Sequence, residues 1–535
     1  MRVLKAWGLW VCLAAGPSWS SAVVGGDYTP EAQADSVDWS TLPGAENLAV
    51  KDGFNMFSGY INVDEMNGRN VFYWFMEAQE NAEDAPVILW TNGGPGCSGM
   101  LGLLAEHGPF QVRDGGENLV DNNYSWNKIA NMLYVEIPSG VGFSYSDTES
   151  DYQQTGDDKT AVDNYWLVQG WLERFPQYRR NDFHISSESY GGHYMPQLAE
   201  EILLRNKQAR VVDTVPVINF AGFLVGNPYT DARSNQAAQY EAYWGDQLLP
   251  KFVYDNYRAG CVDTDEVLLG RQGDLDDCQE LEQKMDSFIG NVNPYALDFP
   301  ICLDEGGTGA TVARAQRLAL RDHHVRAMAE DRQSSRKGNE MEEAGSPARP
   351  SLKVASQAPY EPCAQDFTIP YLNRDDVQEA LRVREGTVWE QCSTKVEYLS
   401  SDMMRPMMPY YRRLLNDHDI PILVFSGDDD AVCATEGTQW WIYNLGFNVD
   451  ASNTWKTWEV EGQVAGYQTS FEDVKLSFVT VHSAGHEVPA YQPARAFKLL
   501  EKYLDGSWWG GDEDANGNRG EGGAGGGDVS EALSL

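Results

Sequence analysis

The spacing of hydrophobic residues changes along this chain, and each spacing predicts a different kind of element. Apolar and polar positions alternate over residues 54–63 and 71–76, which is typical of an antiparallel hairpin. Other short runs are apolar at every position, as in strands that are buried on both faces of a mainly parallel sheet. These runs cover residues 87–90, 132–135, 183–185, 217–225 and 422–425.

Helical periodicity separates the apolar runs, most clearly at residues 157–175 and 195–207. Strands that alternate with helices predict an α/β fold, in which helices cover both faces of a central, mainly parallel sheet. At 535 residues the chain has room for two or three domains, but one large α/β domain with an inserted cap fits as well. We assign residues 23–231 and 393–508 to the two parts of this core.

The alternation stops in residues 232–392, which we interpret as a cap inserted into the core. Within this cap, residues 305–357 are polar and rich in Arg, Gly and Ser, and they contain too little apolar material to order themselves. This composition predicts an exposed, protease-sensitive loop, although its basic residues would also suit a binding patch. Residues 509–535 are rich in Gly, Asp and Glu and are predicted to form a disordered tail.

The N-terminus has the pattern of a secretory signal. Arg2 and Lys5 precede an apolar run at residues 6–15, and small residues follow up to Ala22, where we expect cleavage. No later run has the length of a membrane helix, so we expect no membrane anchor. These features predict passage through the secretory pathway to a vacuole, a lysosome or the cell exterior. The net charge of −40 suits an acidic compartment and argues against nucleic acid as a partner.

Cysteine usage agrees with an oxidising compartment. Of the eight cysteines, Cys12 would leave with the signal. The seven that remain predict three disulfides and one free thiol. No two of them have the spacing of zinc ligands, and we expect neither a metal nor a cofactor. The one glycosylation sequon begins at Asn123.

Ser189 follows a short apolar run and has the setting of a catalytic serine. It lies between Glu188 and Tyr190, and the small residues Ser187 and Gly191 stand two positions before and after it. A sharp turn from strand to helix at such a position exposes the serine hydroxyl above the sheet and crowds the flanking positions. Ser187 replaces the Gly of the usual motif. Ordinary turns also match such short patterns, so the assignment depends on partners further along the chain.

A serine nucleophile needs a base and a carboxylate that orients the base, and two loops after apolar strands supply both. The first loop contains Asp428, Asp429 and Asp430, and the second contains His482 and His486. The order Ser, Asp, His is the order found in α/β-hydrolases. We favour His486 as the base because it lies past a strand end, whereas His482 falls within the strand pattern. The sequence alone does not choose among the three aspartates.

A glycine-rich loop at residues 92–99 follows the buried run that ends at Trp90. Glycines allow backbone N–H groups to approach a substrate closely, as an oxyanion hole requires. A tight turn without a function is the alternative interpretation. Together with the serine turn and the ordered Asp and His, the loop favours a serine hydrolase.

The chain resembles the serine carboxypeptidases over about residues 42–500. Several ordered motifs carry the resemblance: FSGY at 57–60, NGGPGCS at 92–98, PSGVGFSYS at 138–146, ESYGGHY at 188–194, GNP at 226–228, YLNR at 371–374, GDDD at 427–430 and GHEVP at 485–489. The departures are Ser187 for Gly, Ser139 for the commoner Ala, the long polar loop and the acidic tail. None of these departures removes a catalytic group. The resemblance implies an α/β-hydrolase fold with an inserted, disulfide-stapled cap, and removal of C-terminal amino acids from peptides.

The resemblance also implies a role for individual residues. Ser189 would be the nucleophile, His486 the base and Asp430 the acid that orients it. The backbone N–H groups of Gly94 and Tyr190 would form the oxyanion hole. The C-terminal carboxylate of a peptide would be held by a group of neighbouring residues: Asn92, Gly93, Glu106, Glu188 and, in support, Trp90.

Two further roles concern acidic residues in the substrate site. Glu106 and Glu188 would share one proton, because two close carboxyls cannot both ionise cheaply, and their apparent pKa would rise above about 4.3. The protonated pair would donate to the substrate carboxylate, and the deprotonated pair would repel it. We therefore expect peptide hydrolysis to be best at acidic pH. Glu487, next to the base, would line the pocket of the departing residue and favour Lys or Arg.

The resemblance leaves Cys433 as a free thiol near the substrate and implies three disulfides: Cys97–Cys392, Cys261–Cys278 and Cys302–Cys363. Members of the family often form homodimers, so a homodimer is an expectation for this chain. An acyltransferase or a hydroxynitrile lyase is an alternative function, and so is a protective partner whose catalysis is incidental. The presence of Asn92, Glu106 and Glu188 favours a peptide with a free C-terminus.

Overall fold

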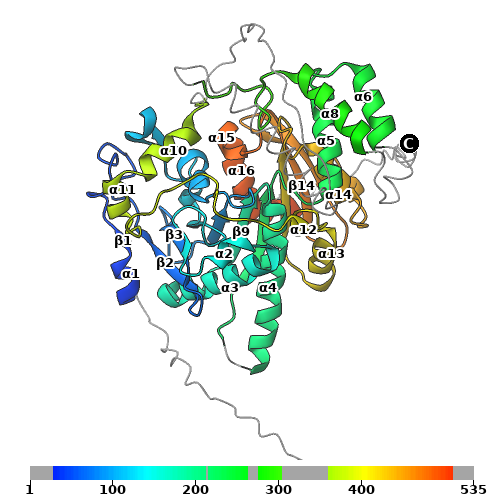
Figure 1. Cartoon of the computed structure of the whole chain (residues 1–535). Coiled ribbons are helices and arrows are strands. Elements are labelled where there is room, and N and C mark those ends of the chain that lie inside the picture. The colour runs from blue at the N-terminus through cyan, green and yellow to red at the C-terminus, as the bar shows by residue number, and fades with distance from the viewer. Residues whose placement is uncertain (1–27, 213–214, 263–274, 304–359, 510–535) are drawn as a thin grey trace, which may run out of the picture.

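The computed structural model describes residues 28–212, 215–262, 275–303 and 360–509 (Figure 1). Three predicted segments lie outside the described residues: the signal (1–22), the polar loop (305–357) and, beyond its first residue, the acidic tail (509–535). No helix in the described ranges combines the length and the apolar composition needed to span a membrane.

The fold is built around a twelve-stranded sheet whose six central strands are parallel. In spatial order these strands are β7 (Asn131–Val135), β4 (Val87–Thr91), β9 (Phe183–Glu188), β10 (Phe220–Gly226), β11 (Ile422–Gly427) and β14 (Leu476–Val481). Each apolar run from the sequence falls in one of these strands, although β10 begins at Phe220 rather than at residue 217. The predicted α/β fold with a mainly parallel sheet is confirmed.

Antiparallel strands extend the sheet at both edges. Beside β7 lie β3 (Arg69–Met76), β2 (Met56–Asp64), β1 (Ser36–Val37) and the short β8 (Tyr145–Ser146), and beside β14 lie β13 (Gln463–Ser470) and β12 (Lys456–Val460). The hairpin of β2 and β3 was predicted, but the hairpin of β12 and β13 was not. Only one residue of β12 is buried, so this edge strand has no apolar run. A separate two-stranded sheet pairs β5 (Phe110–Arg113) with β6 (Asn118–Asp121).

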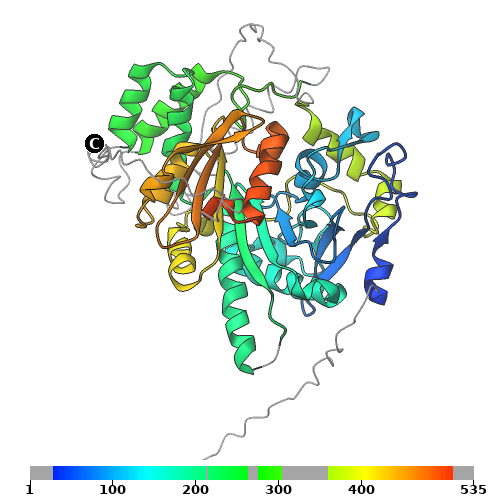
Figure 2. The same ribbon diagram turned by 180° about the vertical axis from the view of Figure 1, so that it is seen from behind.

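Helices cover both faces of the sheet (Figures 1 and 2). Successive residues of β4 point to opposite faces and enter two different hydrophobic cores. The first core takes residues from α3 (Asp157–Arg174), α4 (Gly191–Val212) and α13 (Met408–Asp417), and the second takes residues from α16 (Pro493–Leu504). Every residue of β4 is buried, which explains why its sequence shows no alternation.

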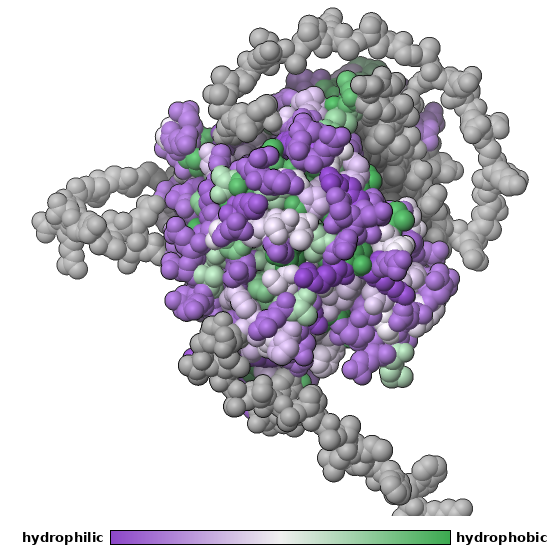
Figure 3. Space-filling view, turned by 90° about the vertical axis from the view of Figure 1, so that its left-hand side faces the viewer, coloured by the Kyte–Doolittle hydropathy of each residue, from purple (hydrophilic) through white to green (hydrophobic). Residues whose placement is uncertain are grey.

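The described part of the inserted segment consists of two helical groups that lie apart (Figure 1). Helices α5 (Ala232–Gly245), α6 (Lys251–Tyr257) and α8 (Leu275–Ile289) share a small core that also contains Ala431 and Ala434, just after β11. Helices α10 (Ala364–Leu372) and α11 (Asp375–Ala380) instead join the second core near β5. The surface on the side of α11 is mainly hydrophilic, with scattered apolar residues (Figure 3).

The three disulfides of the structure connect the inserted segment to the core and to itself. Cys97–Cys392 joins the glycine-rich loop to the end of the insertion and spans 295 residues, whereas Cys261–Cys278 and Cys302–Cys363 lie within the insertion. In the loop-entropy account, a link of such length stabilises the fold by up to about 5 kcal/mol. Cys433 is a buried free thiol.

Candidate active site

Ser189 lies in the turn between β9 and α4. Its φ of 59° is in the left-handed region, which residues with a side chain rarely adopt. Two backbone hydrogen bonds hold it there: the Ser189 N–H donates to the Gly226 carbonyl at 3.0 Å, and the Tyr229 N–H donates to the Ser189 carbonyl at 2.8 Å. The strained turn is therefore fixed by the end of β10 and the loop that follows it.

In this turn, the space beside the Cα of Gly191 is too small for a side chain. A Cβ added to Gly191 would overlap both the Cβ and the Oγ of Ser187. The two positions face each other, and the site has room for one side chain between them. Ser187 can replace the Gly of the usual motif because Gly191 leaves that room free.

A buried histidine and aspartate lie together beyond the ends of β14 and β11. The His486 Nδ1 is 2.7 Å from the Asp430 Oδ2. Asp430 also accepts hydrogen bonds from the Asn227 side chain at 2.8 Å and from the backbone N–H groups of Val432 and Cys433. With its carboxylate held in this way, Asp430 can orient His486 and stabilise its charged form. Asn227 lies in the loop after β10. The sequence analysis included it in the GNP motif but did not predict that it would hold Asp430.

The other two aspartates of the loop have different partners. Asp428 pairs with His482, whose Nδ1 is 2.8 Å from the Asp428 Oδ2, and the His482 side chain is 58% exposed. His482 follows β14 rather than lying within it, so that part of the sequence interpretation is wrong. Asp429 accepts from the backbone N–H of Asp298, and thereby anchors the inserted segment to the core. The geometry thus separates three residues that order and spacing alone left equivalent, and it places Asp430, the one that the family resemblance favours, beside His486.

Two opposing effects set the pKa of His486. Burial lowers it, but the charge and hydrogen bond of Asp430, together with the charges of Glu487 and Glu106, outweigh burial and raise it to about 9. The imidazole therefore holds a proton readily, which suits a group that takes the proton of a serine hydroxyl.

The glycine-rich loop passes directly against the serine turn. A Cβ on Gly93 would lie 2.8 Å from the Cβ of Ser189 and would overlap the backbone nitrogen of Tyr190. The next residue, Gly94, has a φ of 111°. Only glycine allows this approach, which brings the backbone of Gly93 and Gly94 beside Ser189 and Tyr190. The glycine-rich loop and the serine turn are thus adjacent, as the two segments of an oxyanion hole must be.

Two buried carboxyl groups meet at the side chain of Asn92. The Asn92 Nδ2 donates to the Glu106 Oε1 at 2.9 Å and to the Glu188 Oε1 at 2.7 Å. The Asn92 Oδ1 accepts from the Trp90 indole N–H at 2.9 Å and from the Gly102 N–H at 3.1 Å. These four bonds fix the orientation of the amide, and Trp90 supplies one of them.

The carboxyl pair retains a proton. Burial and the charge of Glu487 raise the pKa of Glu106 to about 8. Burial and the charges of Glu106 and Glu487 raise the pKa of Glu188 well above its ordinary value. Both side chains are shielded from solvent, so the charged forms are poorly solvated and repel each other. At neutral pH the pair can therefore donate a hydrogen bond.

These groups surround a cavity of about 480 Å³. Ser189, His486, Glu188 and the glycine-rich loop form one wall, and residues of the inserted segment, including those near Tyr360 and Asn293, form the other. Glu487 lines the same cavity and is largely buried, and burial raises its pKa. The cavity thus combines a nucleophile, the Glu188 carboxyl of the buried pair and three further acidic side chains, those of Glu487, Glu361 and Asp366.

Cys433 lies behind Ser189 rather than on the cavity wall. Its thiol is buried beside Ser189, and burial and the charge of Asp430 raise its pKa well above the ordinary value for a thiol. The sequence placed Cys433 in the substrate pocket, but the cavity lining does not include it, and it is a thiol and not a reactive thiolate. Elsewhere, Asn123 of the sequon is exposed. The described ranges contain no group of three or more His, Cys, Asp or Glu side chains that could hold a metal ion.

Comparison with known proteins gives one consistent result. Residues 43–506 match the family described as serine carboxypeptidase. Serine carboxypeptidase-like 26 of Arabidopsis thaliana is 35% identical over 470 residues, which cover 87% of this chain and 92% of the relative. Serine carboxypeptidase 24 of the same plant is 34% identical over 471 residues, with 87% and 91% covered. The crystal structure of Kex1(delta)p, a prohormone-processing carboxypeptidase from Saccharomyces cerevisiae, has the same fold, with a TM-score of 0.66 at 21% identity and coverage of 89% and 97%.

The facing pair in the serine turn can be tested by exchange. Gly191→Ala should destabilise the protein by about 1–3 kcal/mol and reduce turnover of an ester substrate, because the new Cβ overlaps Ser187. The double variant Ser187→Gly/Gly191→Ala should recover most of both losses, since it moves the one Cβ to the other side. Thermal unfolding and ester turnover of the wild type, both single variants and the double variant provide the comparison. A double variant as impaired as Gly191→Ala would contradict this account of the turn.

Proposed function

Because this chain belongs to the serine carboxypeptidase family, a family of hydrolases, we propose that it removes the C-terminal amino acid of peptides through an acyl-enzyme on Ser189. One observation carries the proposal: the Asn92 amide, fixed between the buried carboxyls of Glu106 and Glu188, lines the serine cavity. The proton held by this carboxyl pair is a hydrogen-bond donor suited to a carboxylate, and it lies beside a nucleophile. A peptide whose C-terminal carboxylate bound there would present its last peptide bond to Ser189.

The proposed reaction uses the groups at the site in order. The Ser189 Oγ attacks the carbonyl carbon of the last peptide bond, and its proton passes to His486 at Nε2, since Nδ1 is engaged with Asp430. The N–H groups of Gly94 and Tyr190 donate to the oxyanion. His486 then gives its proton to the leaving amine, and the C–N bond breaks to leave an ester on Ser189. Water attacks this ester by the same steps and releases the shortened peptide.

Binding and chemistry make opposite demands on pH. The carboxyl pair must hold a proton to receive a carboxylate, and with a Glu106 pKa of about 8 this condition is lost as pH rises through that value. His486 must be neutral to act as a base, although its pKa is raised to about 9. Protonation of Glu106 and Glu487 removes charges that raise this pKa, so the conditions that load the pair also make the base easier to deprotonate. We therefore propose that peptide hydrolysis is favoured on the acidic side.

Cellular context follows from the N-terminus and the disulfides. The signal-like segment and the three disulfide pairs support a protein that folds in the secretory pathway, with a vacuole, a lysosome or the cell exterior as its destination. The exposed Asn123 is the proposed glycosylation site. A homodimer is the form proposed from the family.

Acyl transfer is the second candidate function. It uses the same nucleophile and base, with an acceptor other than water completing the reaction. The carboxyl pair favours the peptidase, because an acyl donor without a free carboxylate has no use for it.

Release of free amino acids decides between these functions. From blocked dipeptides that end in Leu or Lys, between about pH 4 and 8, the wild type should release the last residue, with faster release in acid. Ser189→Ala should lower the rate by at least about 1000-fold, because it removes the nucleophile. Ester turnover without amino-acid release would instead favour acyl transfer. If neither substrate is turned over, the partner role is favoured and the proposal is wrong.

The carboxyl pair predicts a pH effect on binding alone. Above the pKa of the pair, the KM for a peptide should rise by about tenfold per pH unit, whereas the KM for an ester without a carboxylate should stay flat. In the double variant Glu106→Gln/Glu188→Gln, two permanently neutral amides should make the peptide KM independent of pH. Steady-state kinetics from about pH 5 to 9 give both profiles. A peptide KM that stays flat in the wild type would count against the shared proton.

Glu487 is the proposed determinant for basic C-terminal residues. Glu487→Gln should lower the ratio of Lys to Leu release by about 10- to 100-fold, because a buried charge pairing with the substrate is lost. Glu361→Gln is the matched control, since Glu361 lines the same cavity in the inserted segment. An equal drop in both variants would assign the preference to the total charge of the cavity, and an unchanged ratio in Glu487→Gln would remove the role of Glu487.

A further inference from the structure

We infer that Asp157 is a positioning residue that holds both halves of the oxyanion hole in place. The inference rests on the proposed function only in that it assigns the oxyanion to the N–H groups of Tyr190 and of the glycine-rich loop. Asp157 is the first residue of α3 and contacts neither the cavity nor the catalytic histidine. It acts through side chains that lie between it and these two backbone segments.

The Asp157 carboxylate is buried and fully engaged. Its Oδ1 accepts from the hydroxyls of Tyr190 at 3.0 Å and Tyr398 at 2.7 Å. Its Oδ2 accepts from the His193 Nδ1 at 3.0 Å and the Gln197 Nε2 at 2.8 Å. Only 1% of the residue is exposed. Burial alone would raise its pKa, but the hydrogen bond and charge of His193 and the other donors lower it, so the group stays ionised and the bonds are charge-assisted.

The first half of the oxyanion hole is Tyr190 itself. Its ring stacks on His193, with centroids 4.4 Å apart at 18°, and meets Tyr398 edge-on at 5.4 Å. Its hydroxyl ends on Asp157. The Tyr190 ring is thus contacted by the His193 ring, by the Tyr398 ring and, at its hydroxyl, by Asp157. These three contacts restrict rotation of the side chain and so hold the residue, with its backbone N–H, in one orientation.

The second half is the glycine-rich loop, which Asp157 reaches through two tyrosines. The Tyr194 hydroxyl accepts from the backbone N–H of Gly96 at 3.2 Å. Tyr194 also packs edge-on against Tyr398, with ring centroids 6.4 Å apart, and the Tyr398 hydroxyl donates to Asp157. A chain of contacts therefore leads from Asp157 through Tyr398 and Tyr194 to the loop that carries Gly94. One carboxylate is the common anchor of two segments whose relative position decides the geometry of the oxyanion hole.

The anchor is itself fixed to the rest of the fold. The Asp157 N–H donates to the Asp402 Oδ2 at 2.8 Å, and the Asp402 Oδ1 accepts from the Arg405 Nη2 at 2.6 Å. The position of Asp157 therefore depends on the start of α3 and on a segment after the insertion, and not on the loops that it holds.

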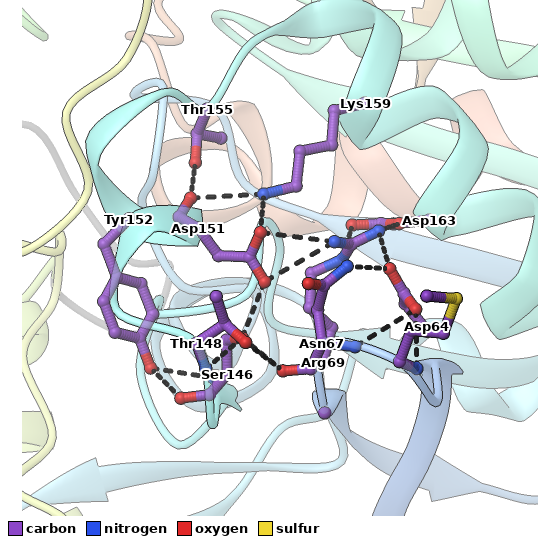
Figure 4. Close-up of polar contacts among 12 residues, drawn as sticks. Asp64, Asn67, Arg69, Ser146, Thr148, Asp151, Tyr152, Thr155, Lys159 and Asp163 are labelled. Atoms are coloured by element: carbon purple, nitrogen blue, oxygen red, sulfur yellow. Dashed lines mark hydrogen bonds and ion pairs between the residues drawn. The ribbon is translucent and has the colours of Figure 1, made fainter.

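Another residue of the same helix provides a matched control. Asp163 is 3% exposed and is bound by Arg69, in a network with Asp64 and Asp151 that ties the hairpin of β2 and β3 to α3 and to the short helix α2 (Ser150–Gln153) before it (Figure 4). Its partners are side chains remote from the serine cavity. Loss of this carboxylate should affect stability as much as loss of Asp157, but it should leave the oxyanion hole unchanged.

The test compares Asp157→Asn with Asp163→Asn on an ester substrate, since ester hydrolysis passes through the same oxyanion without needing the carboxyl pair. We expect kcat to fall by about 10- to 100-fold in Asp157→Asn at a nearly unchanged KM, because complete loss of one donor costs about 100- to 1000-fold. Asp163→Asn should keep the wild-type kcat. Circular dichroism and thermal unfolding give the fraction of folded protein, by which every rate is corrected.

An unchanged kcat in Asp157→Asn, or a fall that disappears after this correction, would overturn the inference. If Asp157→Asn does not fold, Tyr190→Phe and Tyr194→Phe decide, because each removes one hydroxyl of the path and keeps the backbone. A lower kcat in both supports the inference, and the wild-type kcat in both overturns it. Failure of peptide release with ester turnover intact would refute the proposed peptidase but not the role of Asp157, whereas absence of all turnover in the wild type would refute both.

Discussion

Backbone hydrogen bonds from the end of β10 hold Ser189 in a conformation that an isolated chain would avoid, and the remaining site groups are arranged around that turn. In the parallel sheet, β9 lies between β4 and β10, so the carboxyl ends of neighbouring strands open at the same edge. The glycine-rich loop follows β4, Asn227 follows β10 and Asp430 follows β11. Each group therefore follows directly after a strand whose register is fixed by hydrogen bonds to its buried neighbours. The positions of the site groups are thus set by the sheet rather than by the loops that carry them.

Sequence patterns predicted the parts of this arrangement that depend on residue type and order. Apolar runs identified the central strands, because a strand buried on both faces needs an apolar residue at every position. The hairpin of β12 and β13 escaped prediction because β12 is an exposed edge strand and the buried positions of β13 hold small and polar residues rather than an apolar run. Within the site, order and spacing predicted Ser189 and His486 as nucleophile and base. The prediction of Asp430 needed the family resemblance, because residue types alone do not show how a turn directs three successive carboxylates to three different partners. Asp157 gave no signal, since its partner Tyr398 lies 241 residues away along the chain.

Burial of acidic groups also makes the stability of the folded state depend on pH. The pKa values of Glu106 and of Glu136, a buried residue that accepts from Ser98 and the Trp389 indole, are raised by burial from 4.5 to about 8 and about 7. Between pH 4.5 and these values the folded chain binds more protons than the unfolded chain. The free energy of unfolding contributed by these groups therefore falls as pH rises through this window. The same burial that prepares the site for a carboxylate thus makes the fold more stable in acid.

Because of the disulfide between Cys302 and Cys363, the shape of the cavity does not depend on the length of the chain between these two cysteines. Both residues border the cavity wall, Cys302 directly and Cys363 through its neighbours Pro362 and Ala364, and the bond holds the two chain ends together. Once the ends are joined, lengthening the intervening segment costs only a logarithmic loss of entropy, about 0.6 kcal/mol for each doubling. Insertions of very different size can therefore be accepted at this point, by evolution or by an engineer who adds a tag or a domain, without displacing the substrate wall.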